Sequence, residues 1–238
     1  MDTREKTPKK RLKRRYKLLI WLSADVIFAG IIIVLLLYKP PGYEPVDMRT
    51  QPEEGPRQFS RYLTYLYSQM HNNAQKNETF EIDVLEAGIN QAIASAKWPQ
   101  RSENITFAQP KAEFNENGIT VTGTANVEGI DLLVTVQGLL QMLEDGKLNV
   151  HIQSVKIGAM NITLLAKYIA KQMYKEKFGM MYAESTDPRV LIAASLMEDT
   201  PFDPIFEVND KGVRLTQTTM VEDIVRLKFA PLTAPRQE

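Results

Sequence analysis

The 238-residue chain carries 29 basic and 29 acidic residues, so its formal net charge is zero, and it has two histidines and no cysteine. This composition argues against a nucleic-acid-binding protein, a disulfide-stabilised domain and a Cys/His metal protein, and the missing cysteines suit a bacterial envelope protein. The charge is unevenly distributed, because residues 1–17 contain nine Lys or Arg against two acidic residues, a net +7.

The apolar stretch Leu18–Tyr38 follows this basic segment and contains one charged residue, Asp25. At about 1.5 Å per residue, the stretch matches the roughly 30 Å hydrocarbon core of a bilayer. It is longer than the apolar part of a signal peptide, about 7–15 residues, and it lacks a small-x-small cleavage site. We therefore expect an uncleaved signal anchor, a single-pass transmembrane helix. Asp25 is then either a functional contact at membrane depth or a shallow residue that reaches the interface.

Basic residues beside a membrane span remain on the cytoplasmic side, so the chain is expected in the plasma (inner) membrane with its C-terminal domain extracytoplasmic. The domain organisation follows from this orientation. We expect a basic cytoplasmic tail over 1–17, the transmembrane helix over 18–38, a Pro-rich linker over 39–57, an extracytoplasmic α+β domain over 58–230, and a tail over 231–238.

Apolar residues at three- and four-residue spacing predict helices in the extracytoplasmic domain. Asp83 is expected to cap the second of them, because Glu86 follows three residues later. The predicted helices cover Phe59–Asn73, Val84 to about Trp98, Leu164–Phe178 and Val190–Met197.

Alternating apolar and polar residues predict strands between about Asn104 and Gly158, with a hairpin turn at Asn117-Gly118. A further hairpin and a last strand are expected between Ile205 and Phe229. The predicted fold class is α+β: one N-terminal transmembrane helix, then a curved antiparallel β-meander packed with amphipathic helices.

One face of this meander is continuously aliphatic and also carries Gly123 and Gly138, which permit bending or close approach of a ligand. Such a face either remains an apolar groove or closes into an ordinary core, and the sequence leaves both possibilities open. The residues predicted to line a groove are Val121, Ala125, Val134, Val136, Leu140, Val150 and Ile152.

Lys167, Lys171 and Lys175 form a basic stripe on one predicted helix. This stripe either contacts lipid headgroups or is a solvated helix face. No catalytic motif, nucleotide-binding loop or metal-ligand spacing is recognisable around His71 or His151. We therefore expect no enzymatic activity, no cofactor, no metal site and no nucleic-acid partner.

Several short motifs within Ile82–Thr163 carry a family resemblance. They are Ile89-Asn90-Gln91-Ala92-Ile93, the Asn117-Gly118 hairpin, the Asp145-Gly146-Lys147-Leu148 turn, and Val155-Lys156-Ile157-Gly158-Ala159-Met160 before a helix. In this order they resemble the YpmS-like family of single-span bacterial envelope proteins and, more distantly, the tubular lipid-binding (TULIP) superfamily. The resemblance implies a curved sheet wrapped on helices that holds lipid on its concave apolar surface, without catalysis.

The predicted function is the binding, transfer or sensing of a lipid or another apolar envelope component by a membrane-anchored protein. The alternative is an interaction module of an envelope assembly, whose sheet has a closed core and which docks protein partners.

Overall fold

The computed structural model describes residues 9–40, 60–102, 105–178 and 187–232, with the side chains of 9–19, 102 and 173–178 left out. The helices are α1 (Lys9–Leu36), α2 (Arg61–Gln75), α3 (Glu86–Ala94), α4 (Thr163–Phe178) and α5 (Pro188–Glu198). The strands are β1 (Phe80–Leu85), β2 (Gln100–Ser102), β3 (Ile105–Phe107), β4 (Lys111–Asn115), β5 (Gly118–Val127), β6 (Ile130–Met142), β7 (Leu148–Ile157), β8 (Met160–Asn161), β9 (Ile205–Val208), β10 (Lys211–Val221) and β11 (Ile224–Pro231).

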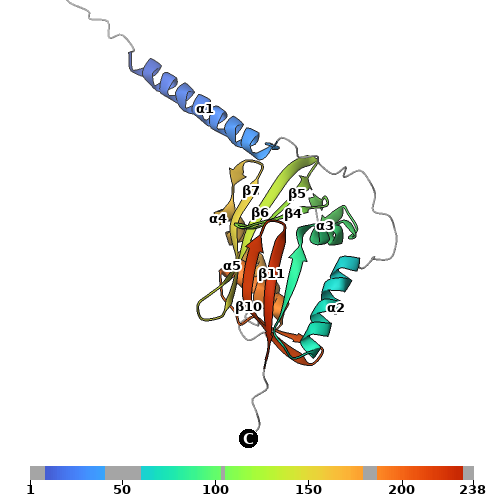
Figure 1. Cartoon of the computed structure of the whole chain (residues 1–238). Coiled ribbons are helices and arrows are strands. Elements are labelled where there is room, and N and C mark those ends of the chain that lie inside the picture. The colour runs from blue at the N-terminus through green and yellow to red at the C-terminus, as the bar shows by residue number, and fades with distance from the viewer. Residues whose placement is uncertain (1–8, 41–59, 103–104, 179–186, 233–238) are drawn as a thin grey trace, which may run out of the picture.

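These strands form two antiparallel sheets (Figure 1). The larger sheet has the order β2-β3-β5-β6-β7-β8, and β4 pairs with β5 alongside β3. The smaller sheet has the order β1-β11-β10-β9, so an early strand joins the last three. The predicted meander is the middle of the larger sheet, whereas no second sheet was predicted. The β4–β5 turn lies one residue earlier than predicted, at Glu116-Asn117, because Asn115 pairs with Gly118.

The main core lies where the apolar face of the smaller sheet meets α2, α5 and one end of the larger sheet. Phe80 and Phe229 stack across β1 and β11 with ring centroids 5.4 Å apart. The buried members of this core are Ala74, Ile82, Leu148, Phe202, Val208, Val213, Leu215 and Phe229. No α1 residue belongs to either core cluster of the described residues. The domain from α2 onward therefore has a core of its own.

Helix α3 is attached to β4 by the Asn90 side chain, which donates to the Ala112 carbonyl (2.7 Å) and accepts from the Ala112 amide (2.8 Å). The Glu86 carboxylate likewise accepts from the Phe114 amide at 2.7 Å. The predicted cap by Asp83 is wrong. This residue lies within β1, and α3 begins at Glu86 with no side-chain cap.

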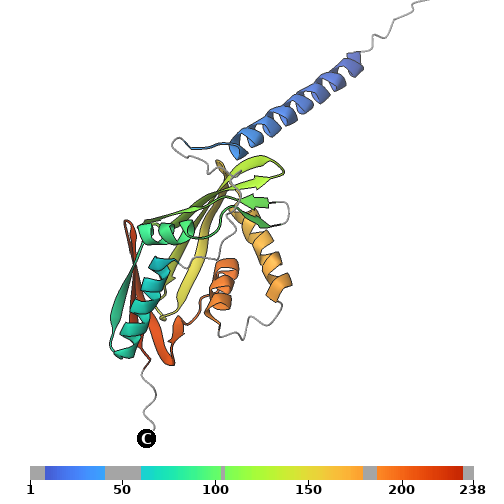
Figure 2. The same ribbon diagram turned by 90° about the vertical axis from the view of Figure 1, so that its right-hand side faces the viewer.

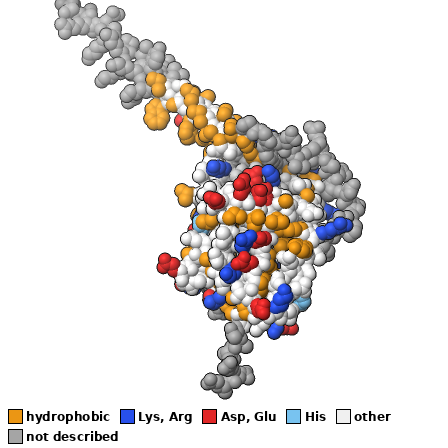
Figure 3. All heavy atoms as spheres, viewed as in Figure 1, with side chains coloured by type: hydrophobic (Ala, Val, Ile, Leu, Met, Phe, Trp, Pro, Cys, Tyr) orange, Lys and Arg blue, Asp and Glu red, His pale blue; other side chains and the backbone are white. Residues whose placement is uncertain are grey.

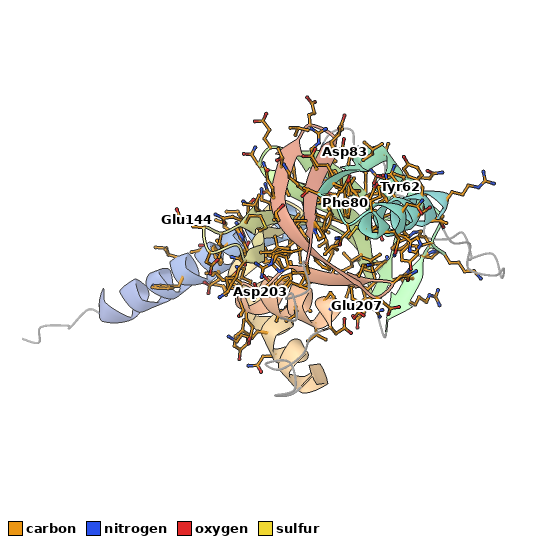
Figure 4. The ribbon with its side chains drawn as sticks, turned by 60° about the horizontal axis from the view of Figure 1, so that its bottom comes forward. Tyr62, Phe80, Asp83, Glu144, Asp203 and Glu207 are labelled. Carbon is orange, nitrogen blue, oxygen red and sulfur yellow. The ribbon has the colours of Figure 1, made fainter. Side chains whose placement is uncertain are left out.

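The outer face of the smaller sheet is charged, and its ion pairs follow the strand register. Arg226 binds both Asp83 carboxylate oxygens, at 2.7 and 2.9 Å, directly across β1 and β11. Lys228 lies 3.7 Å from its cross-strand neighbour Glu81. Acidic and basic side chains accordingly alternate over these strands (Figure 3). In Figure 4, Tyr62 of α2 lies beside β1, and its hydroxyl accepts from the Leu85 amide.

Strand β7 would be a free edge along most of its length, because β8 pairs only with Lys156 and Ile157. Other segments bind this edge instead. Phe202 forms an isolated bridge with Leu148, the buried Ser195 hydroxyl accepts from the Val150 amide (2.8 Å), and the Thr163 hydroxyl accepts from the Val155 amide (2.8 Å). Covered edges resist pairing with strands of other chains.

Helix α1 extends away from the domain (Figure 2), and the prediction for it must be corrected. Among the residues that the structure describes, no helix is both long and apolar enough to cross a membrane. The predicted transmembrane helix over Leu18–Tyr38 is therefore wrong for the described part of the chain.

Some predictions fall wholly or partly outside the described residues. The basic tail over 1–17 is described only as helical backbone from Lys9, and the linker over 39–57 only to Pro40. The C-terminal tail over 231–238 is described only to Leu232.

Removing the Ser195 hydroxyl should destabilise the domain. Ser195→Ala leaves the Val150 amide without its acceptor at the fully buried Ser195 position, and a lost buried partner costs about 1–3 kcal/mol of unfolding free energy. Urea denaturation measures this loss. Ser154→Ala, also on β7, is the matched control because the Ser154 hydroxyl makes only a 3.5 Å contact with Gln137. Equal effects of the two changes would contradict this role for Ser195.

The Asp83–Arg226 pair should make stability depend on pH. The hydrogen bond from Arg226 lowers the pKa of Asp83 in the folded state, so the pair stabilises the fold above the unfolded pKa of about 3.9 and loses this effect as acid protonates Asp83. Asp83→Asn should therefore lower the urea midpoint at neutral pH, by less than Ser195→Ala does, and change it little in acid. Glu207→Gln, an exposed change on β9, is the control, and a deficit of Asp83→Asn that persists in acid would contradict the linkage.

Candidate apolar binding site

The structure does not bring the seven predicted groove residues together in one site. Val121, Val134 and Val136 line a hollow at one end of the larger sheet. Leu140 and Val150 lie toward the other end of the same face, where they pack into the main core with Leu191 and Ile192 of α5 among others. Ala125 and Ile152 belong neither to the hollow nor to the main core. Ala125 is buried opposite Phe107, and Ile152 is half-buried opposite Gly138.

The hollow, hereafter the Trp98 hollow, has a volume of about 220 Å³. Its floor consists of β5 and β6, and its wall consists of described residues between Trp98 and Pro110. The residues that line it are Trp98, Gln100, Phe107, Ala108, Pro110, Val121, Gly123, Thr124, Val134 and Val136.

Hydrogen bonds hold the wall in place. The indole Nε1 of Trp98 donates to the carbonyl of Ile93 at 2.7 Å, which ties the wall to the end of α3. The Ala108 amide donates to the Thr124 carbonyl at 2.9 Å, which ties the other end of the wall to β5. The half-buried indole ring is therefore a fixed side of the hollow rather than a loose surface group.

Gly123 allows Pro110 to lie close against β5. A Cβ atom built on Gly123 would lie 3.2 Å from the Pro110 Cβ, closer than ordinary van der Waals contact. The sequence predicted close approach at this glycine, and in the structure the approaching group is a residue of the chain itself. A larger residue here would press on the wall and reduce the hollow.

The chemistry of the hollow is that of apolar contact. None of its lining residues carries a charge, and Gln100 and Thr124 are its polar side chains. Phe107, 40% exposed, lies at its margin. Pockets for drug-sized ligands measure about 300–1,000 Å³, so a hollow of this size suits one segment of a chain-like ligand rather than a whole lipid.

The predicted basic stripe is partly neutralised by acidic residues. Lys167 lies 3.0 Å from Asp199, and Lys171 lies 3.6 Å from Glu198, so both connect α4 to the end of α5. The side chain of Lys175 lies outside the described residues. These ion pairs orient α4 about its own axis.

The two histidines lie apart from the hollow lining. The Nδ1 atom of His71 lies 3.0 Å from the side-chain nitrogen Nδ2 of Asn209. His151 lies in β7 opposite Leu139, and its buried Nδ1 has no hydrogen-bond partner among the described atoms.

A second hollow, of about 490 Å³, has a polar lining that includes Glu86, Glu113, Glu116, Glu222 and Asp223. It lies between the β4–β5 and β10–β11 turns. Within the described residues, no group of three His, Asp or Glu side chains is arranged to hold a metal ion.

Sequence reasoning missed the wall of the Trp98 hollow. From the sequence alone, Trp98 is predicted to end a helix and the residues from about Asn104 to begin the strands. The available signal was the run of aromatic and proline residues directly before the aliphatic strands, since such residues are frequent in apolar sites.

Comparison with protein-family models finds no match to this chain, and comparison with curated proteins finds none either. The resemblance to the YpmS-like family therefore stays a prediction.

Proposed function

We propose that this protein binds a lipid, or another apolar envelope component, by enclosing one apolar segment of it in the Trp98 hollow, without catalysis. The observation that carries the proposal is the apolar lining of the hollow, built by Val121, Val134 and Val136 on one side and Trp98 and Phe107 on the other. A ligand gains affinity there chiefly by removing its own apolar surface from water.

The size of the hollow limits what it can enclose. Each buried methylene group contributes about 0.8 kcal/mol, so a few groups of an acyl chain bind with modest affinity. Binding of this strength is reversible, as transfer or sensing of a ligand requires. The rest of the ligand would extend past Phe107 into solvent or into an apolar phase nearby.

Filling the hollow should abolish most binding. Val134→Phe places a phenyl ring over the floor and should exclude about two methylene groups, which costs about 1.6 kcal/mol and weakens binding roughly tenfold. The measurement is titration of the full chain with a fluorescent fatty acid.

Thr135→Phe is the matched control for this change, because Thr135 is the next residue along β6 and faces the opposite side of the sheet, where it contacts Thr122. Equal affinities of Val134→Phe, Thr135→Phe and the unchanged protein would exclude the hollow as the binding site.

Trp98 provides a second, direct readout. The chain has two tryptophans, so Trp21→Phe leaves Trp98 as the sole indole emitter. A ligand in the hollow should shield the half-buried indole ring, and acrylamide quenching of its emission should fall. Quenching that is unchanged at saturating fatty acid would place any bound ligand elsewhere.

The second candidate function is an interaction module with a closed core. Its support is that Leu140 and Val150, two of the seven predicted groove residues, pack into the main core with α5. Helix α2 meanwhile exposes Leu63 (49%) and Tyr67 (62%) on one side, as a docking helix would.

Native mass spectrometry of residues 58–238, which include both core clusters, separates the two candidates. A co-purified mass that organic solvent releases as lipid favours the first function, and a ligand-free mass favours the second.

A further inference from the structure

The outward side of α4 is an apolar surface next to the Trp98 hollow. Leu164, Leu165, Tyr168 and Ile169 are 87, 57, 64 and 47% exposed, and their spacing places them on one side of the helix. These four residues are hereafter the α4 apolar face. Lys167 and Lys171 bind acidic residues at the end of α5, so the helix cannot rotate to hide this face without breaking those pairs.

The α4 apolar face begins at the same end of the larger sheet as two other apolar features. Thr163, the first residue of α4, binds the Val155 amide, and Val155 pairs with Val136 of the Trp98 hollow. Two residue pairs further along β7, Val134 of the hollow lies opposite Ile157. Two residues after Ile157, the backbone amide of Ala159 donates to the Leu35 carbonyl of α1 at 2.8 Å. Hollow, α1 end and α4 start are therefore neighbours.

Between Ile20 and Leu36, most side chains of α1 are apolar and exposed, with Ser23 and Asp25 as the polar exceptions. The apolar ones include Trp21 (73% exposed), Phe28 (66%) and Val34 (68%), and Figure 3 shows largely hydrophobic surface along the described part of α1. Exposed apolar surface of this extent marks a site of contact with a partner or a membrane. Whatever surrounds the end of α1 also lies against the neighbouring start of α4.

The charge of the chain indicates which surroundings these are. Residues 1–17, with a net charge of +7, precede the apolar part of α1. Clustered Lys and Arg residues bind anionic lipid headgroups at about 1 kcal/mol each. Tyr168 also suits a lipid surface, because its ring can lie at the headgroup level with its hydroxyl in water.

We propose that the α4 apolar face rests on the surface of a lipid bilayer that contains anionic lipid. This contact would hold the Trp98 hollow at the bilayer, where an acyl chain can reach it. The contact itself does not require the hollow to be occupied.

A probe on α4 tests this contact. The chain contains no cysteine, so Leu165→Cys accepts a single environment-sensitive NBD fluorophore. The labelled full chain is assembled at a single copy per nanodisc made of phosphatidylcholine with a minor fraction of phosphatidylglycerol. The control is Gln217→Cys, labelled in the same way, because Gln217 is exposed on the charged outer face of the smaller sheet.

The expected result at position 165 is a blue-shifted NBD emission that brominated acyl chains quench and that is protected from iodide. Position 217 should show none of these three effects. Equal iodide quenching at both positions would overturn the proposal, as would failure of the chain to bind the discs. A blue shift at position 165 that appears only when two copies share a disc would assign the face to a second copy and also overturn it.

The outcome is independent of the binding site. Val134→Phe should leave the emission at position 165 unchanged, because the α4 apolar face does not include the hollow. Loss of fatty-acid binding with an unchanged blue shift would separate the two proposals.

Discussion

The pairing of β1 with β11 is the constraint on which the rest of the domain depends. It aligns six residue pairs from Phe80↔Phe229 to Leu85↔Ile224, across almost 150 residues of chain. Closing so long a loop costs conformational entropy, and the buried apolar face of the four-stranded sheet offsets this cost. On the other face, the same register places Arg226 opposite Asp83 and Lys228 opposite Glu81.

This closure also decides how much of the larger sheet is covered. The smaller sheet, α2 and α5 cover the end of the meander that carries Leu140 and Val150, and that end becomes the main core. They leave the other end, with Val134 and Val136, to the short wall from Trp98 to Pro110. A core and a hollow on one aliphatic face thus follow from a single arrangement of covering elements.

Three apolar features lie together at one end of the larger sheet. The Trp98 hollow, the end of α1 and the start of α4 are connected through neighbouring residues of β7 and the β7–β8 turn. At the edge of β7, Phe202, Ser195 and Thr163 occupy backbone groups that would otherwise be open to another strand. Contiguous exposed apolar surface commonly marks an interaction site, and the covered edge of β7 leaves fewer backbone groups open to other strands.

The local elements were largely determined by the sequence, because helix and strand periodicities are properties of neighbouring residues. The helices at α2, α4 and α5 lie within a few residues of their predicted bounds, and the alternation at β5, β6 and β7 identified the aliphatic face. Tertiary structure alone decided that Asp83 belongs to a strand, since its β11 partner lies far along the chain. It also decided which half of the aliphatic face is core, because burial depends on distant segments, and it corrected the transmembrane prediction within the described residues.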